Sequence, residues 1–154
     1  MRFPSDKRGL LGHAMANIDN IDYQKVLEKR VLLPLDMTNT TVTPSKKQQQ
    51  QLSLGYDIQA KPTKHWQLPT LAGAGALYST SDDMAKYLLA NINGSPLKQA
   101  IELAQTATAN FGRPQTSIGL GWIIQHINEQ SLVIHNGATG GYRSFIGFDK
   151  KTGK

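Results

Sequence analysis

Apolar residues recur at helical spacing in the first third of the chain. This spacing predicts a helix over residues 9–18 with one apolar side. A second helix is predicted to begin after a cap at Asn20 or Asp22 and to stop at Pro34, because these residue types start and end helices, respectively. The side chains expected to be buried on the first helix are Leu10, Leu11, Ala14, Met15 and Ile18.

The middle of the chain combines a polar run with two further helical segments. Residues 46–51 are polar and low in complexity, which indicates an exposed connection, and residues 52–58 are predicted to form a short strand. A helix is expected over residues 80–92, because a Thr followed three positions later by an Asp is typical of a capped start. A fourth helix is expected over residues 95–105, which open with Ser-Pro.

Beyond these helices the apolar period changes to two, which is typical of β-strands. Strands are expected from residue 118 onward, over residues 130–135 and over residues 142–148. One face of the first strand is predicted to carry Ile118, Leu120, Trp122 and Ile124.

The order of the elements, helices first and strands last, indicates an α+β fold without βαβ alternation. We expect residues 1–154 to form a single partial domain, mainly helical over 1–112, with two or three antiparallel strands in 113–154. Residues 149–153 have the composition of a hairpin turn but lead to no further strand, so the strand before them is expected at an exposed sheet edge. Such an edge favours self-association, and the pattern predicts that the chain is part of a longer protein.

Composition excludes several classes of function. The 154 residues carry a net charge of +6, but Lys and Arg are scattered and few aromatics accompany them, which argues against a nucleic-acid groove. The chain has no Cys, so disulfides and thiolate metal sites are excluded, and its His residues lack partners at metal-ligand spacing. Its apolar runs are far shorter than a membrane span requires.

The most informative segment of the sequence runs from residue 135 to residue 145. Gly137, Gly140 and Gly141 remove side chains where the backbone of a substrate needs room, and His135 offers a titratable ring. This segment resembles the Lys-Thr-Gly box of penicillin-recognising serine hydrolases, in the His-x-Gly form of some β-lactamase-related peptidases and esterases.

Three further stretches resemble the same family and occur in the family's order. Residues 31–40 are similar to a stretch that ends in Pro-Leu-Gly-Met-x-x-Thr, and residues 74–85 to a Gly-Gly-Leu-x-Ser-Thr-x-x-Asp-Met-Ala segment. Residues 119–122 are similar to class C β-lactamases. Because the ordered set covers nearly the whole chain, the sequence resembles the serine β-lactamase superfamily, and its class C and penicillin-binding-protein branch in particular.

The resemblance implies a partial β-lactamase/transpeptidase-like fold and a part in acyl transfer. In this family a Ser-x-x-Lys pair supplies the nucleophile and its base, a Tyr-x-Asn element follows, and the Lys-Thr-Gly strand binds the substrate. Carried over, His135, Asn136 and Gly137 match the Lys-Thr-Gly box. Asn136 would hydrogen-bond the substrate, His135 would take the place of the Lys cation, and Ala138 would supply an oxyanion N–H.

The resemblance also implies the kind of ligand and the location of the intact protein. The substrate would be a β-lactam, a peptide similar to D-Ala-D-Ala or an ester, and neither a metal nor an organic cofactor is implied. The intact protein would lie in the periplasm or the cell envelope, whereas the sequence of this chain leaves the location open.

The nucleophilic half of such a site has no good match in the chain. The Tyr-x-Asn position falls on Phe3 and Ser5, which lack the phenol hydroxyl and the amide of that element. Residues 95–98 spell Ser-x-x-Lys, but a Ser-Pro pair is better explained as a helix start. Residues 151–153 spell Lys-Thr-Gly, but they lie in a turn that follows the strand instead of in the strand itself.

Two functional interpretations follow. The first is the C-terminal portion of a β-lactamase-related serine hydrolase, inactive as this chain alone because it lacks an activated nucleophile. The second is a non-catalytic relic, or a module that binds peptidoglycan-like peptides or a protein partner through the exposed edge strand.

Overall fold

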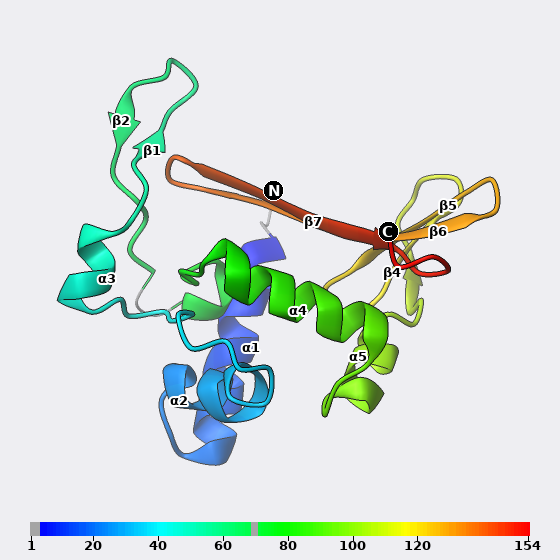
Figure 1. The fold of residues 1–154 in the computed structure, drawn as a ribbon, viewed down its shortest axis with the longest axis horizontal. Helices are drawn as coiled ribbons and strands as arrows, with labels where there is room; N and C mark the ends of the chain where they lie inside the picture. The colour runs from blue at the N-terminus through cyan, green and yellow to red at the C-terminus, as the bar shows by residue number, and fades with distance from the viewer. Residues whose placement is uncertain (1–3, 69–70) are drawn as a thin grey trace. The chain divides into compact units, whose positions relative to one another are not determined.

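The computed structural model describes residues 4–68 and 71–154, with the side chains of residues 4–7 outside the described part. The helical elements in chain order are α1 (Pro4–Asp19), α2 (Tyr23–Leu27), the π-helical turn η1 (Glu28–Leu32), α3 (Lys46–Gln50), the 3-10 turn η2 (Ala72–Ala74), α4 (Ser81–Asn93) and α5 (Lys98–Ala104) (Figure 1). The strands are β1 (Gly55–Tyr56), β2 (Pro62–Thr63), β3 (Ala109–Asn110), β4 (Thr116–Ile118), β5 (Ile123–Ile127), β6 (Gln130–Thr139) and β7 (Tyr142–Asp149).

The α+β order predicted from the sequence is confirmed. The helices of the described residues all precede a five-stranded antiparallel sheet with the strand order β3-β4-β5-β6-β7, and β1 and β2 form a separate two-stranded hairpin. The sheet has more strands than the two or three expected, because β3 and β4 are only two and three residues long and give little periodic signal. In the described part of the chain, β7 lies at an edge of this sheet, as expected.

The chain forms two compact units. One contains the residues up to Met84 together with Ala138–Arg143, and the other contains Ala85–Gly137 together with Ser144–Lys154. The expected division into a helical part, 1–112, and a sheet part, 113–154, stays a prediction.

In the first unit, α1 buries the side opposite to the one that its hydrophobic pattern predicts. Its buried positions are Gly9, Gly12 and Ala16. A Cβ atom on Gly9 would lie 2.9 Å from the Leu71 Cβ, and one on Gly12 would lie 3.0 Å from the Tyr23 ring. Small residues therefore let the neighbouring segments approach the helix axis. The predicted apolar face is wrong, since most of it is exposed: Leu10 is 69%, Leu11 61% and Ile18 80% exposed.

A buried carboxylate ties the loop before α3 to the start of α4, also within the first unit. Asp83 is 1% exposed. Its Oδ2 accepts hydrogen bonds from the Thr40 hydroxyl at 2.7 Å and from the Asn39 N–H at 2.8 Å. The Asp83 N–H donates to the Thr80 hydroxyl at 3.2 Å, which confirms the predicted capped helix start. Similarly, Asp22 caps α2, as its side chain accepts the N–H of Lys25 at 3.0 Å.

The second unit has an aromatic core between α4 and the sheet. Trp122 and Phe148 are both 4% exposed, and Val133 is fully buried. The Trp122 ring stacks on Tyr87 at a centroid distance of 6.3 Å and meets Phe148 edge to face at 5.9 Å. Because these rings come from α4, from the residue before β5 and from β7, they fix the helix on one face of the sheet.

The strand expected from residue 118 onward is interrupted by a turn. β4 ends at Ile118 and β5 begins at Ile123. Gly121 has a φ of +85°, which turns the chain back so that the two strands pair, with Ile118 opposite Ile123. Leu120 is therefore 57% exposed instead of lying on the buried face.

Two shorter predictions are also corrected. Residues 46–51 are exposed as expected, with only Gln48 half-buried, but Lys46–Gln50 form the short helix α3, whose capping box joins Ser45 and Gln48. The helix expected to open with Ser95-Pro96 begins three residues later, at Lys98. Among the described residues, no helix combines the length and the apolar character that a bilayer span requires.

Candidate functional site

The four residues expected to bind a substrate lie in a row on β6. His135 is half-buried, whereas Asn136, Gly137 and Ala138 are exposed. The pairing of β5 with β6 ends at Ile123 opposite Ile134, so residues 135–139 of β6 continue beyond that ladder. The exposed part of the row thus belongs to a stretch of β6 that extends beyond β5. On that side, an extended peptide can form backbone hydrogen bonds with β6.

Gly137 leaves the backbone in the middle of this row without a covering side chain. β7 is the neighbour of β6 on its other side in the sheet. A Cβ on Gly137 would lie 3.3 Å from the Oγ of Ser144, on β7, which is tighter than an ordinary contact. The absence of a side chain leaves the backbone around Asn136 and Ala138 uncovered.

Gly140 and Gly141 serve a different purpose from the one expected. In the first unit, a Cβ on Gly140 would lie 2.6 Å from the Trp66 ring, and one on Gly141 would lie 2.8 Å from the backbone of Gly55. These glycines make room for the protein's own chain, not for a substrate. The prediction of substrate space is therefore wrong at both positions.

Two hydrogen bonds hold the turn between β6 and β7 in place. The Tyr56 N–H donates to the Gly141 carbonyl oxygen at 3.0 Å, and the Tyr142 hydroxyl donates to the Ser53 carbonyl oxygen at 2.6 Å. The segment around the β1–β2 hairpin thus anchors the end of β6, which the sequence did not indicate because the partners lie far apart along the chain.

The two side chains of the Tyr-x-Asn position lie outside the described part of the chain. Phe3 lies outside the described residues, and Ser5 lies on α1 with its side chain outside the described part. Burial raises the pKa of Tyr23, and burial together with a smaller contribution from Tyr142 raises that of Tyr78. Both phenols are therefore protonated at neutral pH. Neither offers a phenolate that could accept a proton in place of the Tyr of the Tyr-x-Asn element.

The Ser-x-x-Lys string at 95–98 is used for local structure. The Ser95 hydroxyl accepts the N–H of Leu97 at 3.1 Å. The Lys98 amine lies 3.8 Å from a Glu102 carboxylate oxygen, one helical turn further along α5, and its side chain is 71% exposed. A serine nucleophile needs a base that accepts its proton, and this lysine faces a carboxylate in solvent instead.

The Lys-Thr-Gly string at 151–153 lies in a turn, as predicted. The Asp149 side chain accepts the N–H groups of Lys151 at 2.7 Å and of Thr152 at 3.2 Å. Gly153 has a φ of +69°, and its N–H returns to the Asp149 carbonyl oxygen at 2.8 Å. These residues form a turn that follows β7 and are not part of a strand.

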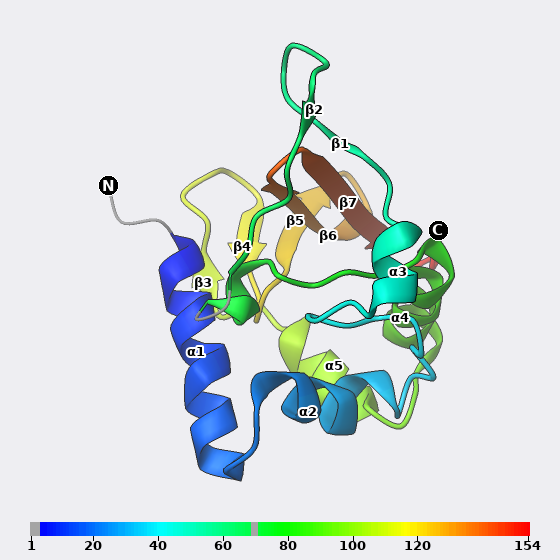
Figure 2. The same cartoon turned by 90° about the vertical axis from the view of Figure 1, so that its left-hand side faces the viewer.

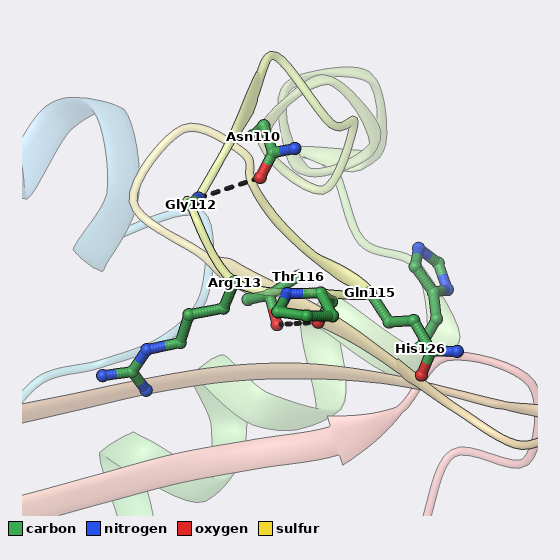
Figure 3. A pocket seen from close by; sticks show the side chains of 7 residues that line it. Asn110, Gly112, Arg113, Gln115, Thr116 and His126 are labelled. Atoms are coloured by element: carbon green, nitrogen blue, oxygen red, sulfur yellow. Dashed lines mark hydrogen bonds between the residues drawn. The ribbon is translucent and has the colours of Figure 1, made fainter.

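A shallow depression of about 520 Å³ lies elsewhere in the second unit, on the loop between β3 and β4 (Figure 3). Asn110 shapes this loop by accepting the N–H of Gly112 at 2.8 Å. Arg113 and His126 lie at opposite ends of it and point away from each other (Figure 3). The depression contains none of the four candidate residues, and the Arg113 and His126 side chains do not converge on a common point.

Comparison with known proteins gives a consistent picture. The family model described as Beta-lactamase matches residues 8–154. The chain is 26% identical over 154 residues to the D-alanyl-D-alanine-carboxypeptidase/endopeptidase AmpH of Escherichia coli K12, and the match covers 89% of this chain and 39% of AmpH. It is 29% identical over 118 residues to a β-lactamase of Pseudomonas fluorescens, covering 74% of this chain and 32% of that enzyme.

Solved structures show the same fold. A class C β-lactamase superposes with a TM-score of 0.85 at 20% identity, covering 98% of this chain and 49% of that chain. A β-lactamase/D-alanine carboxypeptidase from Pseudomonas syringae superposes with a TM-score of 0.83 at 19% identity, covering 95% and 50%. The chain thus spans about half the length of these structures and 39% of AmpH.

Proposed function

Because the chain belongs to the β-lactamase family, whose model matches residues 8–154, we propose that residues 135–138 are the substrate-binding strand of an acyl-transfer site. The observation that carries the proposal is the exposed row of Asn136, Gly137 and Ala138 on the part of β6 that extends beyond β5. An exposed strand segment offers N–H and C=O groups in register with an amide or lactam.

Each residue of the row has a chemical part in this proposal. The Ala138 N–H donates to the oxygen of the substrate carbonyl, whose negative charge grows as the tetrahedral intermediate forms. The Asn136 amide hydrogen-bonds a flanking polar group of the substrate. His135 contributes a ring that becomes cationic below its pKa and then attracts a substrate carboxylate.

The serine that attacks the carbonyl is proposed to come from polypeptide other than these 154 residues. The Ser95 hydroxyl accepts the N–H of Leu97, and Lys98 faces Glu102. In the complete site, a serine oxygen would bond to the carbonyl carbon while a base takes its proton, and the departing amine or alcohol would then receive that proton. The chain alone is therefore inactive.

The substrate class follows from the relatives and not from the geometry. One relative is named for D-alanyl-D-alanine carboxypeptidase activity and another is a β-lactamase. We accordingly include a β-lactam, a D-Ala-D-Ala-like peptide and an ester among the proposed substrates. The partner proposal includes self-association through β7, because this strand lies at the sheet edge and carries Phe145, which is 71% exposed.

Intact-mass spectrometry with benzylpenicillin tests this proposal. The chain alone should form no penicilloyl adduct. When the chain is mixed with the region of E. coli AmpH outside the 39% that it matches, that region should be acylated, and Asn136→Leu should slow the reaction. Gln130→Leu, at the exposed beginning of the same strand, is the matched control and should leave the rate unchanged. An adduct on the chain alone that disappears in Ser95→Ala would refute the assignment.

A further inference from the structure

We propose that the β1–β2 hairpin of the first unit docks on the surface of a lipid bilayer that contains anionic lipids. The docking surface, called the hairpin surface below, combines three apolar side chains with two cations: Leu54, Tyr56, Ile58, Lys61 and Lys64. The proposal goes beyond the proposed function and does not depend on it, because none of these residues belongs to the substrate strand.

The apolar residues of the hairpin surface point away from the rest of the first unit. Gly55 on β1 is buried, and a Cβ there would lie 3.0 Å from the Tyr142 ring. Because alternate residues of an extended strand point to opposite sides, the side chains of Leu54 and Tyr56 lie on the other side. Leu54 is 68%, Tyr56 51% and Ile58 83% exposed. Such a group of exposed apolar side chains is typical of an interaction surface.

The tip of the hairpin is an ordered turn that nevertheless presents an isoleucine to solvent. The Asp57 Oδ1 accepts the N–H groups of Gln59 and Lys61, each at 2.9 Å. The Asp57 N–H donates to the Lys61 carbonyl oxygen, also at 2.9 Å, which closes the turn around Ile58. Polar residues and glycine are usual in such a turn. The hairpin projects away from α1 and α2 of the same unit (Figures 1 and 2), so the fixed turn holds the isoleucine in solvent.

The charges of the hairpin favour an anionic surface. Residues 52–66 contain two lysines, Lys61 and Lys64, and one acidic residue, Asp57. Both lysines are exposed, whereas the Asp57 carboxylate accepts the two N–H groups of the turn. Lysines close to a bilayer are attracted by anionic headgroups. The neighbouring apolar side chains can then enter the boundary between the headgroups and the acyl chains.

This combination of side chains fits a bilayer better than a protein partner. Lysine is depleted in protein–protein interfaces, whereas tyrosine and lysine are typical of the membrane–water interface. A stable protein interface also buries about 800 Å² on each partner, which is more than the tip of one short hairpin offers. We therefore assign the hairpin surface to anionic lipid, with attachment to the surface of the bilayer.

Co-sedimentation of the full 154-residue chain with lipid vesicles tests the proposal. The chain should bind vesicles of equal parts phosphatidylcholine and phosphatidylglycerol, and should bind vesicles of phosphatidylcholine alone much more weakly. Ile58→Ser should weaken binding to the anionic vesicles about tenfold or more, because a large apolar group no longer enters the bilayer. Lys64→Gln should weaken it about fivefold and make it less sensitive to salt.

Ile18→Ser is the matched control. Ile18 lies on α1 and is 80% exposed, close to the 83% of Ile58, so this variant should bind the vesicles as the unchanged chain does. In a second measurement, Ile58→Trp places a fluorophore at the tip of the hairpin. Its added emission should shift to the blue with anionic vesicles and should be quenched by brominated lipid. Unchanged circular dichroism of the variants checks that they fold.

Three results would overturn the proposal. The first is the absence of binding to the anionic vesicles, and the second is an equal loss of binding in Ile58→Ser and Ile18→Ser. The third is equal binding to both kinds of vesicle, because the lysines would then have no part in it. A dimer of the chain that Ile58→Ser dissociates, without vesicle binding, would overturn it in favour of a second copy of the chain.

Discussion

The turn between β6 and β7 offers a quantitative test of how the end of the substrate strand is held. Gly141 has a φ of +81°, and a Cβ there would lie 2.8 Å from the backbone of Gly55 and 2.5 Å from the Thr63 Cγ2. In Gly141→Ala, the left-handed backbone costs about 1–2 kcal/mol. The overpacking against backbone that cannot move aside adds about 1–3 kcal/mol. We therefore expect a total loss of about 2–5 kcal/mol in the free energy of unfolding.

The matched control is a glycine with the same backbone conformation and no neighbour. Gly121 has a φ of +85°, and a Cβ there would meet nothing within 4 Å. Gly121→Ala should therefore cost only the conformational part, about 1–2 kcal/mol. Urea unfolding followed by circular dichroism measures both variants. Equal losses would refute the reasoning, because they would show that Gly55 and Thr63 do not pack against the turn.

Two further predictions concern carboxylates of the first unit. Asp83→Ala should destabilise the chain by roughly 2–4 kcal/mol, because it leaves the Thr40 hydroxyl and the Asn39 N–H without their buried acceptor; urea unfolding measures this, and a loss below 1 kcal/mol would contradict the network. The Arg30 side chain, by hydrogen bonding, lowers the pKa of Asp19 from 3.8, so the stability contributed by this pair is present above pH 3.8 and is lost as the pH falls through the lowered value. Asp19→Asn should consequently destabilise the chain at pH 7, and this effect should shrink as the pH falls below 3.8; an effect that does not change with pH would exclude the pair as the cause.

The existence of the elements was largely predictable, whereas their packing was not. The helical spacing located α1, the capped start at Thr80 located α4, and Asp22 was one of two residues, with Asn20, proposed to cap the second helix. The face that α1 buries was not predictable, because glycine carries no hydrophobic signal even where it brings two backbones together. Gly12 next to the Tyr23 ring is the clearest example.

The candidate strand was predicted because several segments resemble the β-lactamase family in the family's order. Its exposed position in the sheet could not be predicted from the sequence. That position depends on the register of β5 against β6, which is set by the turn at Asn128 and Glu129 after Ile127 pairs with Gln130. No local pattern indicates that β5 begins only at Ile123, opposite Ile134. The purposes of Gly140 and Gly141 depend likewise on contacts with residues 55–66, some eighty positions away in the sequence.

The most direct test of the central claim is an NMR titration of the ¹⁵N-labelled chain with benzylpenicillin. If residues 135–138 bind the substrate, the backbone amide resonances of Asn136, Gly137 and Ala138 should shift with saturation, and no covalent adduct should form. Shifts confined to the loop depression around Arg113, with the amides of β6 unchanged, would contradict the claim.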